Sequence, residues 1–463
     1  MTISSPRGDH AVVLGAGMAG LLAARVLTET YPRVTVVDRD VMPAIGQHRR
    51  GVPQGRHLHV LHPRGAQVLD ELFPGLLEQM TAHGAVRGDT TGTARWQLSG
   101  HRFRQENSGI SGILASRPFL EGHVRAVLGE LPGVTLVPGH DIVGLVATDD
   151  RRRVTGIRLA THRAAASTRT LPADLVMDAT GRGSRTPRWL AELDYPTPTE
   201  DRLDIGLGYA SRTYRLRPGA LGADHGIVTG ATPSVPRGGV LAAIEGDRYI
   251  LTLSGILGDY PPIDPAEFEA FAATLVFPDI TQALQGAQPL DDPVAIRFPA
   301  SVRRRYERLR RFPQQLLVTG DAVCSFNPVY GQGMTVAALE ALALRSLLAG
   351  DASQPRRYFQ AIARLIDVAW DMAVGGDLAF PQVPGPRPAK VRLVNAYLAR
   401  LQAAAASDAS LATAFIRVVG MLDRPETLLR PDRIIRVLRA PRHPICTPGS
   451  RPVPTPVSPT SNG

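Results

Sequence analysis

Cysteine and lysine are both scarce in this chain of 463 residues. Its two cysteines, Cys324 and Cys446, lie far apart and form no C-x-x-C pair, which excludes a disulfide framework and a dithiol redox site. No apolar run is long enough to cross a bilayer, and the first residues lack the basic and apolar segments of a secretory signal. We therefore expect a cytoplasmic protein in a reducing setting, with no membrane partner.

Aromatic residues are missing from the most basic parts of the chain. The net charge is +10, yet Lys390 is the one lysine among 52 basic residues. The arginines are scattered, and the densest runs, at 151–153 and 303–305, have no interleaved aromatic residues of the kind that stack on nucleic-acid bases. We therefore expect solvated surface charge and no nucleic-acid partner, with a positive field that favours an anionic ligand.

A glycine-rich turn between a strand and a helix is the clearest motif present. The stretch HAVVLGAGMAGLLAARVLTETYPRVTVVDRD predicts a strand at 11–14, a helix at 19–27 and a second strand at 34–37. This strand–turn–helix–strand order is the context in which a glycine turn binds a dinucleotide.

Three glycines, Gly15, Gly17 and Gly20, form G-x-G-x-x-G in that turn. Gly15 permits the tight turn, Gly17 leaves room for a pyrophosphate, and Gly20 lets the helix pack closely on the strand. The helix N-terminus offers N–H groups to phosphates, and Asp38, after the second strand, can accept hydrogen bonds from ribose hydroxyls. The motif predicts a dinucleotide site and does not separate NAD from FAD.

A second glycine-containing turn, GDAVCSFNPVYGQGM, begins at Gly320, after a strand predicted at 316–319. Asp321 is placed to bond ribityl hydroxyls, Gly333 permits close approach of a ligand, and the helix from Met334 points its positive end at the turn. A reduced flavin is anionic, so a helix N-terminus stabilises it. Two distant turns therefore favour FAD, with one turn for the ADP end and one for the flavin end.

Three motifs together, GAGMAG, DATGRGSR and GDAVCSFNPVYGQGM, resemble FAD-dependent monooxygenases of the para-hydroxybenzoate hydroxylase type. The stretch RRGVPQGRHLHVLHPRG, at 49–65, is similar to a subgroup that includes the flavin epoxidases of polyether antibiotic biosynthesis, such as those for lasalocid and monensin. The resemblance extends over residues 9–440. It implies an α/β fold with a Rossmann-like FAD-binding domain in three segments, an inserted mixed or antiparallel β-sheet substrate domain, and a helical C-terminal region.

The resemblance and the pattern of strands and helices divide the chain into four parts. We expect the FAD-binding domain at 9–85, 112–190 and 301–350, the substrate domain at 86–111 and 191–300, the helical C-terminal region at 351–440 and a disordered, proline-rich tail at 441–463. Within these parts we predict a helix at 65–80 that Pro74 interrupts, a hairpin turn at 245–247 and a helix at 265–277. By position, the resemblance implies that the cofactor-binding residues are Gly15, Gly17, Met18, Ala19, Gly20, Asp38, Arg39, Arg50, Arg117, Asp178, Asp321, Pro328, Gly331, Gly333 and Met334.

The resemblance also implies an enzyme that transfers one oxygen atom from O2 to a small organic substrate through a flavin C4a-hydroperoxide. Epoxidation of an alkene in a polyketide-type natural product, as in antibiotic biosynthesis, is the expected reaction. Hydroxylation of an aromatic ring is the alternative within the class. A flavin-dependent reductase, dehydrogenase or cyclase, and a flavin-binding protein without turnover, remain open.

NAD(P)H is the expected reductant, acting directly or through a separate flavin reductase. The chain has Asp178 and Ala179 where the aromatic hydroxylases have an Asp-Gly pair tied to FAD and NADPH. No second complete dinucleotide motif follows another strand. Whether NAD(P)H binds to this chain is therefore left open by the sequence.

Histidines cluster in the stretch at 49–65, where His57, His59 and His62 give H-x-H-x-x-H. No acidic or cysteine partner lies nearby, so we expect a structural or cofactor-proximal role and no metal. Three arginines of the same stretch, Arg49, Arg50 and Arg56, are alternative candidates to face the pyrophosphate. The sequence identifies no catalytic acid or base.

Overall fold

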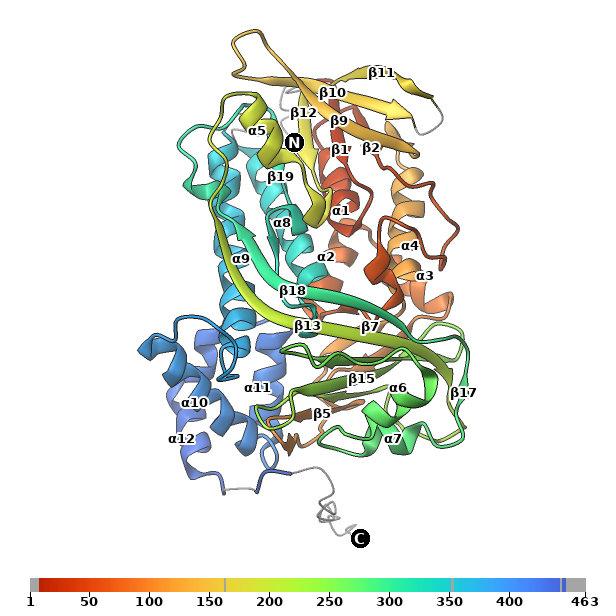
Figure 1. The fold of residues 1–463 in the computed structure, drawn as a ribbon, viewed down its shortest axis with the longest axis vertical. Coiled ribbons are helices and arrows are strands. Elements are labelled where there is room, and N and C mark those ends of the chain that lie inside the picture. The colour runs from red at the N-terminus through yellow and green to blue at the C-terminus, as the bar shows by residue number, and fades with distance from the viewer. Residues whose placement is uncertain (1–7, 162–163, 351–353, 442–443, 447–463) are drawn as a thin grey trace.

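The structure is a computed structural model that describes residues 8–161, 164–350, 354–441 and 444–446. A parallel sheet with its helices forms one part of the molecule (Figure 1). A larger, mostly antiparallel sheet lies beside the C-terminal helices in the other part. The tail predicted at 441–463 lies almost wholly outside the described residues.

A five-stranded parallel sheet forms the centre of the first part, in the order β19-β12-β1-β2-β8. Its strands are β1 (His10–Leu14), β2 (Arg33–Val37), β8 (Val134–Val137), β12 (Leu175–Asp178) and β19 (Leu316–Val318). They are rich in valine and leucine because both faces of a parallel sheet are covered. Three distant stretches of the chain thus meet in one sheet, with β1 in its middle.

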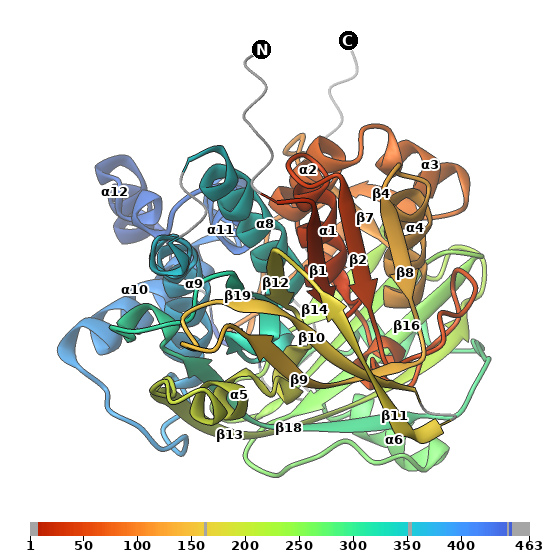
Figure 2. The ribbon, with the colours of Figure 1, turned by 90° about the horizontal axis from the view of Figure 1, so that it is seen from above.

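Helices pack on one face of this sheet, and a small antiparallel sheet covers the other (Figure 2). The helices of this part are α1 (Met18–Leu27), α2 (Pro63–Leu72), α3 (Leu76–Ala82), α4 (Arg117–Gly129), α5 (Thr186–Glu192), α8 (Gly333–Ala349) and α9 (Pro355–Asp377). The small sheet consists of β9 (His140–Ala147), β10 (Val154–Thr161) and β11 (Ala164–Pro172). The helix predicted at 65–80 is divided into α2 and α3 around Pro74, because a proline cannot continue the helical hydrogen bonds.

A nine-stranded sheet dominates the second part, in the order β20-β18-β13-β16-β15-β14-β5-β6 with β17 paired to β13. Its strands are β5 (Ala94–Leu98), β6 (His101–Arg102), β13 (Glu200–Arg215), β14 (Gly226–Thr229), β15 (Arg237–Ile244), β16 (Arg248–Gly255), β17 (Gln288–Pro289), β18 (Val294–Arg304) and β20 (Cys324–Ser325). All pairs are antiparallel except β14 with β5. The hairpin predicted at 245–247 joins β15 to β16.

Two helices, α6 (Pro265–Ala272) and α7 (Asp279–Ala283), pack on one face of this sheet around the buried Phe268. The predicted helix at 265–277 therefore ends earlier, at Ala272. A further small sheet joins the two parts of the molecule and consists of β3 (Val60–Leu61), β4 (Val86–Asp89) and β7 (Ser111–Leu114).

The C-terminal helices pack against the β5–β6 edge of the nine-stranded sheet. They are α10 (Ala389–Ala404), α11 (Ala409–Val419) and α12 (Pro431–Arg439). Phe103, next to β6, meets Phe415 of α11 edge to face at 5.7 Å, within a buried apolar cluster. Among the described residues, no helix is both long and apolar enough to span a membrane.

The first turn of α1 lies directly on the end of β1. Gly15 has a φ of 98°, a left-handed conformation that favours glycine. A Cβ added to Gly20 would lie 1.9 Å from the carbonyl oxygen of Gly15. This close approach fixes where the N-terminus of α1 points, and no side chain can fit between the helix and the strand.

Replacing Gly20 with alanine is therefore expected to lower the free energy of unfolding by about 3 kcal/mol or more, because backbone atoms must move apart. The measurement is the urea midpoint of the apo chain. Gly375→Ala, at a helical position with no atom within 4 Å of the added Cβ, is the matched control and should gain about 0.5–1 kcal/mol. Equal midpoints for the two variants would contradict the packing described.

Candidate functional site

A cavity of about 1800 Å³ lies where the carboxyl ends of the parallel strands meet the nine-stranded sheet. The ends of β1, β2, β12 and β19 all contribute to its lining. Ligands of open α/β sheets bind at this edge. Pockets for one small molecule measure roughly 300–1,000 Å³, so this cavity has room for a cofactor and a second molecule.

The N-terminus of α1 opens onto the cavity. Gly17 is its N-cap residue, with an extended backbone and no side-chain cap. The nearest atom to a Cβ added there is Nη2 of Arg49, at 4.0 Å, so the space in front of the helix is open. Uncapped N–H groups at a helix N-terminus are a site for an anionic group such as a phosphate.

Asp38 stands beside this turn, where β2 ends. Its Oδ2 accepts hydrogen bonds from the backbone N–H of Ala16 at 2.7 Å and from Nη1 of Arg49 at 3.0 Å. Its Oδ1 accepts from the backbone N–H of Asp40 at 2.8 Å. A carboxylate has about four lone pairs, which leaves one on Oδ1 for a ligand hydroxyl.

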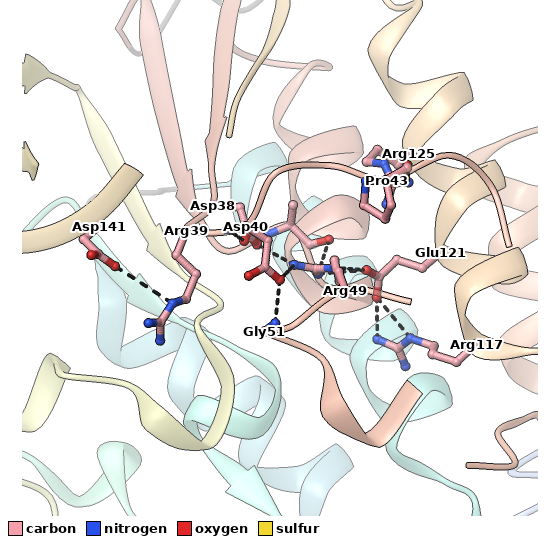
Figure 3. A network of polar contacts seen from close by, with 11 residues as sticks. Asp38, Arg39, Asp40, Pro43, Arg49, Gly51, Arg117, Glu121, Arg125 and Asp141 are labelled. Atoms are coloured by element: carbon pink, nitrogen blue, oxygen red, sulfur yellow. Dashed lines mark hydrogen bonds and ion pairs between the residues drawn. The ribbon is translucent and has the colours of Figure 1, made fainter. Parts of the chain in front are cut away.

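Arg49 holds this corner of the site together (Figure 3). Its side chain is 7% exposed, and Nη1 also lies 3.2 Å from Asp40. Nε donates to Glu121 of α4 at 2.8 Å, and Nη2 donates to the carbonyl oxygen of Ala16 at 3.0 Å. Because every nitrogen of the guanidinium has a protein partner, Arg49 braces the turn and does not serve as a phosphate ligand.

Two other arginines of this corner face the cavity. Arg117, the first residue of α4, bonds Glu121 through Nε at 3.1 Å and lines the cavity (Figure 3). Arg39, after β2, lies 3.9 Å from Asp141 at the cavity wall. The predicted residues Asp38, Arg39 and Arg117 thus meet in one place.

Asp178, at the end of β12, is fully buried and does not line the cavity. Its carboxylate accepts hydrogen bonds from the hydroxyls of Ser184 and Thr186, both at 2.5 Å. The following turn is therefore wound around Asp178. That turn carries Arg182 and Arg185 to the cavity, so the DATGRGSR motif contributes its arginines and not its aspartate.

The second predicted turn reaches the same cavity. Asp321 lines the cavity, and its side chain is exposed to that open space. The carboxyl is removed from bulk water inside the cavity, which raises its pKa, although Arg182 and Arg117 oppose the shift. Helix α8 begins at Gly333 without a side-chain cap, and apart from its chain neighbours and its own helix backbone no described residue comes within 4 Å of a Cβ added there. A second uncapped helix N-terminus therefore points into the cavity.

Glu340 of α8 supports this turn from behind. Its Oε2 accepts hydrogen bonds from the Thr319 hydroxyl and the Gly320 N–H, each at 2.6 Å. Its other oxygen, Oε1, is buried and has no partner among the described residues. Burial raises the pKa of Glu340 to about 7.

A third buried acid, Asp377 of α9, holds the loop between β20 and α8. Its Oδ1 accepts from Nδ2 of Asn327 at 2.8 Å and from the Tyr330 hydroxyl at 3.1 Å. Burial raises the pKa of Asp377 to about 7, and Oδ2 has no partner in the described part of the chain. Asp377 lines the cavity, and His62 contacts the same loop through the carbonyl oxygen of Tyr330, 2.9 Å from Nε2.

The histidines of the 49–65 stretch point to different partners. His57 bonds the Ser211 hydroxyl through Nδ1 at 2.8 Å, and burial lowers its pKa to about 4. His59 lines the cavity, its Nδ1 lies 3.0 Å from the carbonyl oxygen of His57, and burial lowers its pKa to about 3. Within the described residues, no group of three or more His, Cys, Asp or Glu side chains is arranged to hold a metal ion.

Most of the residues predicted for cofactor binding line this one cavity: Gly15, Gly17, Met18, Ala19, Asp38, Arg39, Arg117, Asp321, Pro328, Gly331, Gly333 and Met334. Three do not. Gly20 faces the strand, and Asp178 is buried beneath the turn that follows it. Arg50 is exposed, whereas its neighbour Arg49 points inward. The sequence prediction missed Asp377 and the contribution of α10 and α11, which lie far from any motif.

No protein-family model matches the sequence. Protein Rv3254 of Mycobacterium tuberculosis (strain ATCC 25618 / H37Rv) is 38% identical over 440 residues, which cover 91% of each chain. The solved structure of the flavin-dependent brominase Bmp2 matches with a TM-score of 0.67 and 15% identity, over 92% of this chain and 98% of that one. The p-nitrophenol 4-monooxygenase PnpA from Pseudomonas putida DLL-E4 matches with a TM-score of 0.62 and 16% identity, over 89% and 99%. The predicted α/β fold class is confirmed, and the fold is that of flavin-dependent monooxygenases and halogenases.

The buried Glu340 makes stability depend on pH. Its pKa rises from 4.5 in the unfolded chain to about 7 in the fold, so the folded state holds the proton more tightly. Stability is then greatest below pH 4.5 and falls as pH rises toward 7. Relative to Glu340→Gln, which has no such proton, the wild-type chain should lose up to roughly 3 kcal/mol across this window. Urea midpoints at pH 5 and pH 8 measure this, and parallel pH profiles would contradict it.

Proposed function

Since the chain belongs to the protein family of Rv3254 and has the fold of flavin-dependent monooxygenases and halogenases, we propose that it is an FAD-dependent monooxygenase. The observation that carries the proposal is the pair of uncapped helix N-termini, of α1 and α8, that open onto one large cavity. An elongated dinucleotide such as FAD, whose pyrophosphate and reduced flavin ring both carry negative charge, fits this arrangement.

The residues of the cavity fit FAD from end to end. The N-terminus of α1, where the space in front of Gly17 is open, would hold the pyrophosphate. Asp38 would accept a hydrogen bond from a ribose hydroxyl. Asp321 would bond the ribityl chain. The N-terminus of α8, at Gly333, would face the flavin ring.

When bound and reduced, FAD supplies the two electrons that allow one atom of O2 to enter the substrate and the other to leave as water. We propose NAD(P)H as the source of these electrons, directly or through a separate flavin reductase. The chain itself supplies position and dryness. Glu340 and Asp377 fix the two loops beside the flavin end, and the nine-stranded sheet closes the cavity over them.

Within this class we propose epoxidation of an alkene in a polyketide-type natural product. The support is the resemblance of the 49–65 stretch to the polyether epoxidases, together with the place of that stretch in the cavity wall, where Val52 and Leu58 line it. Epoxidation needs no protein base, because the double bond itself is the nucleophile.

Hydroxylation of an aromatic ring is the second candidate, and the match in fold to the p-nitrophenol 4-monooxygenase PnpA is the observation that favours it. Oxygen labelling separates the two candidates. Turnover with styrene or phenol under 18O2 gives a labelled epoxide in one case and a labelled catechol in the other.

The class of reaction is tested before any substrate is known. FAD-loaded protein is photoreduced and mixed with oxygenated buffer in a stopped-flow spectrometer. We expect reoxidation in two phases, through a transient species that absorbs at shorter wavelength than oxidised flavin. Single-phase reoxidation with stoichiometric release of hydrogen peroxide, with or without either probe substrate, would favour a reductase or dehydrogenase and remove the proposal.

Replacing Gly17 with valine should abolish FAD binding without unfolding the chain. The backbone of Gly17 is extended and the space in front of it is open, so valine fits the fold and fills the approach of the pyrophosphate. The ratio of flavin to protein absorbance after desalting measures the loss, and circular dichroism checks the fold.

The matched control is Gly375→Val, which adds the same side chain in open space outside the cavity. It should keep the wild-type flavin content. A Gly17→Val protein that is folded and fully yellow would show that this turn does not hold the cofactor.

A further inference from the structure

The charged side chains that line the cavity are distributed unevenly between its two ends. Its five arginines are Arg39, Arg49, Arg117, Arg182 and Arg185. All of them lie on the segments that surround the parallel sheet, where the anionic cofactor is proposed to bind. Among the described lining residues of the nine-stranded sheet, α10 and α11, there is no arginine or lysine.

Strand β5 shows how this separation is built. Side chains alternate along a strand, and Ala94, Trp96 and Leu98 line the cavity. Arg95, between them, points to the opposite side, where it pairs with Asp224 at 2.6 Å. The same strand therefore gives an apolar face to the cavity and keeps its charge on the other side of the sheet.

Helix α10 closes the cavity with a single stripe. Asn395, Leu398, Ala399 and Gln402 line it, and their spacing of three and four residues places them on one face of the helix. The two amides are engaged with the protein. Nδ2 of Asn395 donates to the carbonyl oxygen of Gly375 at 2.8 Å, and Gln402 accepts from a serine hydroxyl at 2.5 Å.

Helix α11 adds Phe415, Ile416 and Val419 to the same wall. Among the described lining residues on the sheet side, Asp89 is the one carboxylate. It accepts hydrogen bonds from Thr91, Gly92 and Ser108, and although burial opposes them, these bonds hold its pKa low. The negative charge of Asp89 is therefore stabilised by hydrogen bonds from the protein itself. The chamber between the sheet and helices α10 and α11 thus presents many apolar side chains, and its two amides and Asp89 each have at least one protein partner.

We propose that this chamber is the substrate site and that its substrate is an uncharged, mainly apolar molecule. The proposal rests on the monooxygenase function above and adds the class of substrate. An anionic substrate, such as a benzoate, would lose the hydration of its charge there without gaining a cationic partner, which disfavours its binding. Residues 327–331, which precede α8, line the same cavity as this chamber.

Two related dyes test the charge preference. N-phenyl-1-naphthylamine is neutral, 1-anilinonaphthalene-8-sulfonate carries one negative charge, and both brighten in apolar surroundings. Titrated into FAD-loaded protein, the neutral dye should bind at one site per chain and at least tenfold more tightly than the sulfonate. Equal affinities, or tighter binding of the sulfonate, would overturn the proposal.

The variant Ala399→Trp tests whether the neutral dye binds in the chamber. The indole would fill the space beside the stripe, so dye affinity should fall at least tenfold while the flavin content stays unchanged. Ala396→Trp is the matched control, because Ala396 is on the same helix, is exposed and does not line the cavity. Undiminished binding by folded Ala399→Trp would overturn the placement.

Ala399→Arg gives a second, independent reading in case the tryptophan variant is unstable. A cation on the chamber wall should weaken the neutral dye and tighten the sulfonate, so the order of affinities reverses. No change in that order would contradict the proposal. These titrations need no turnover, so a protein that binds the neutral dye but does not react with O2 would disprove the monooxygenase function and leave the chamber assignment standing.

Discussion

The contact between Gly20 and the carbonyl oxygen of Gly15 is the constraint on which the site depends. It seats α1 on the end of β1 with no side chain between them, so the helix axis and its N-terminus have a fixed direction. Helix α8 packs along α1, and its N-terminus therefore opens onto the same cavity. Two positive helix ends come from stretches about three hundred residues apart: the close approach of backbone atoms positions α1, and packing on α1 positions α8.

Buried acids then shape the loops in front of these helix ends. Asp178 winds the turn that presents Arg182, Glu340 holds the turn before Asp321, and Asp377 holds the loop that precedes α8. Each carboxylate takes hydrogen bonds from its own loop, which fixes the backbone from the protein side and leaves the other side open to a ligand. Burial raises the pKa of Glu340 and Asp377, so the rigidity of these loops has a cost in stability that grows toward neutral pH.

The sequence predicts those features that depend on local spacing. The glycine turn, the strand before it and Asp38 are read from a short stretch, because their geometry is set by neighbours in the chain. The structure places Asp178 outside the lining of the cavity, and the hydroxyls that enclose it come together only when the turn is folded. Arg49, Arg50 and Arg56 lie in a loop with no periodicity, so nothing in the sequence pattern shows which of these side chains points inward. The wall of α10 and α11 is tertiary, and an apolar stripe does not state which surface it covers.

The division of the cavity also explains how one strongly basic chain can serve two very different ligands. Positive charge is useful at the end where a diphosphate must be held, and harmful beside an uncharged substrate, where it would bring water with it. The fold separates the two by alternation along β5, which turns Arg95 toward Asp224 and Trp96 toward the chamber. In the proposed oxygen transfer to a carbon–carbon bond, water competes with the substrate for the oxidant. The chamber for the substrate therefore has to exclude water, although it adjoins the charged end of the cavity that holds the cofactor. The loop held by Asp377 lines the same cavity, between β20 and the N-terminus of α8.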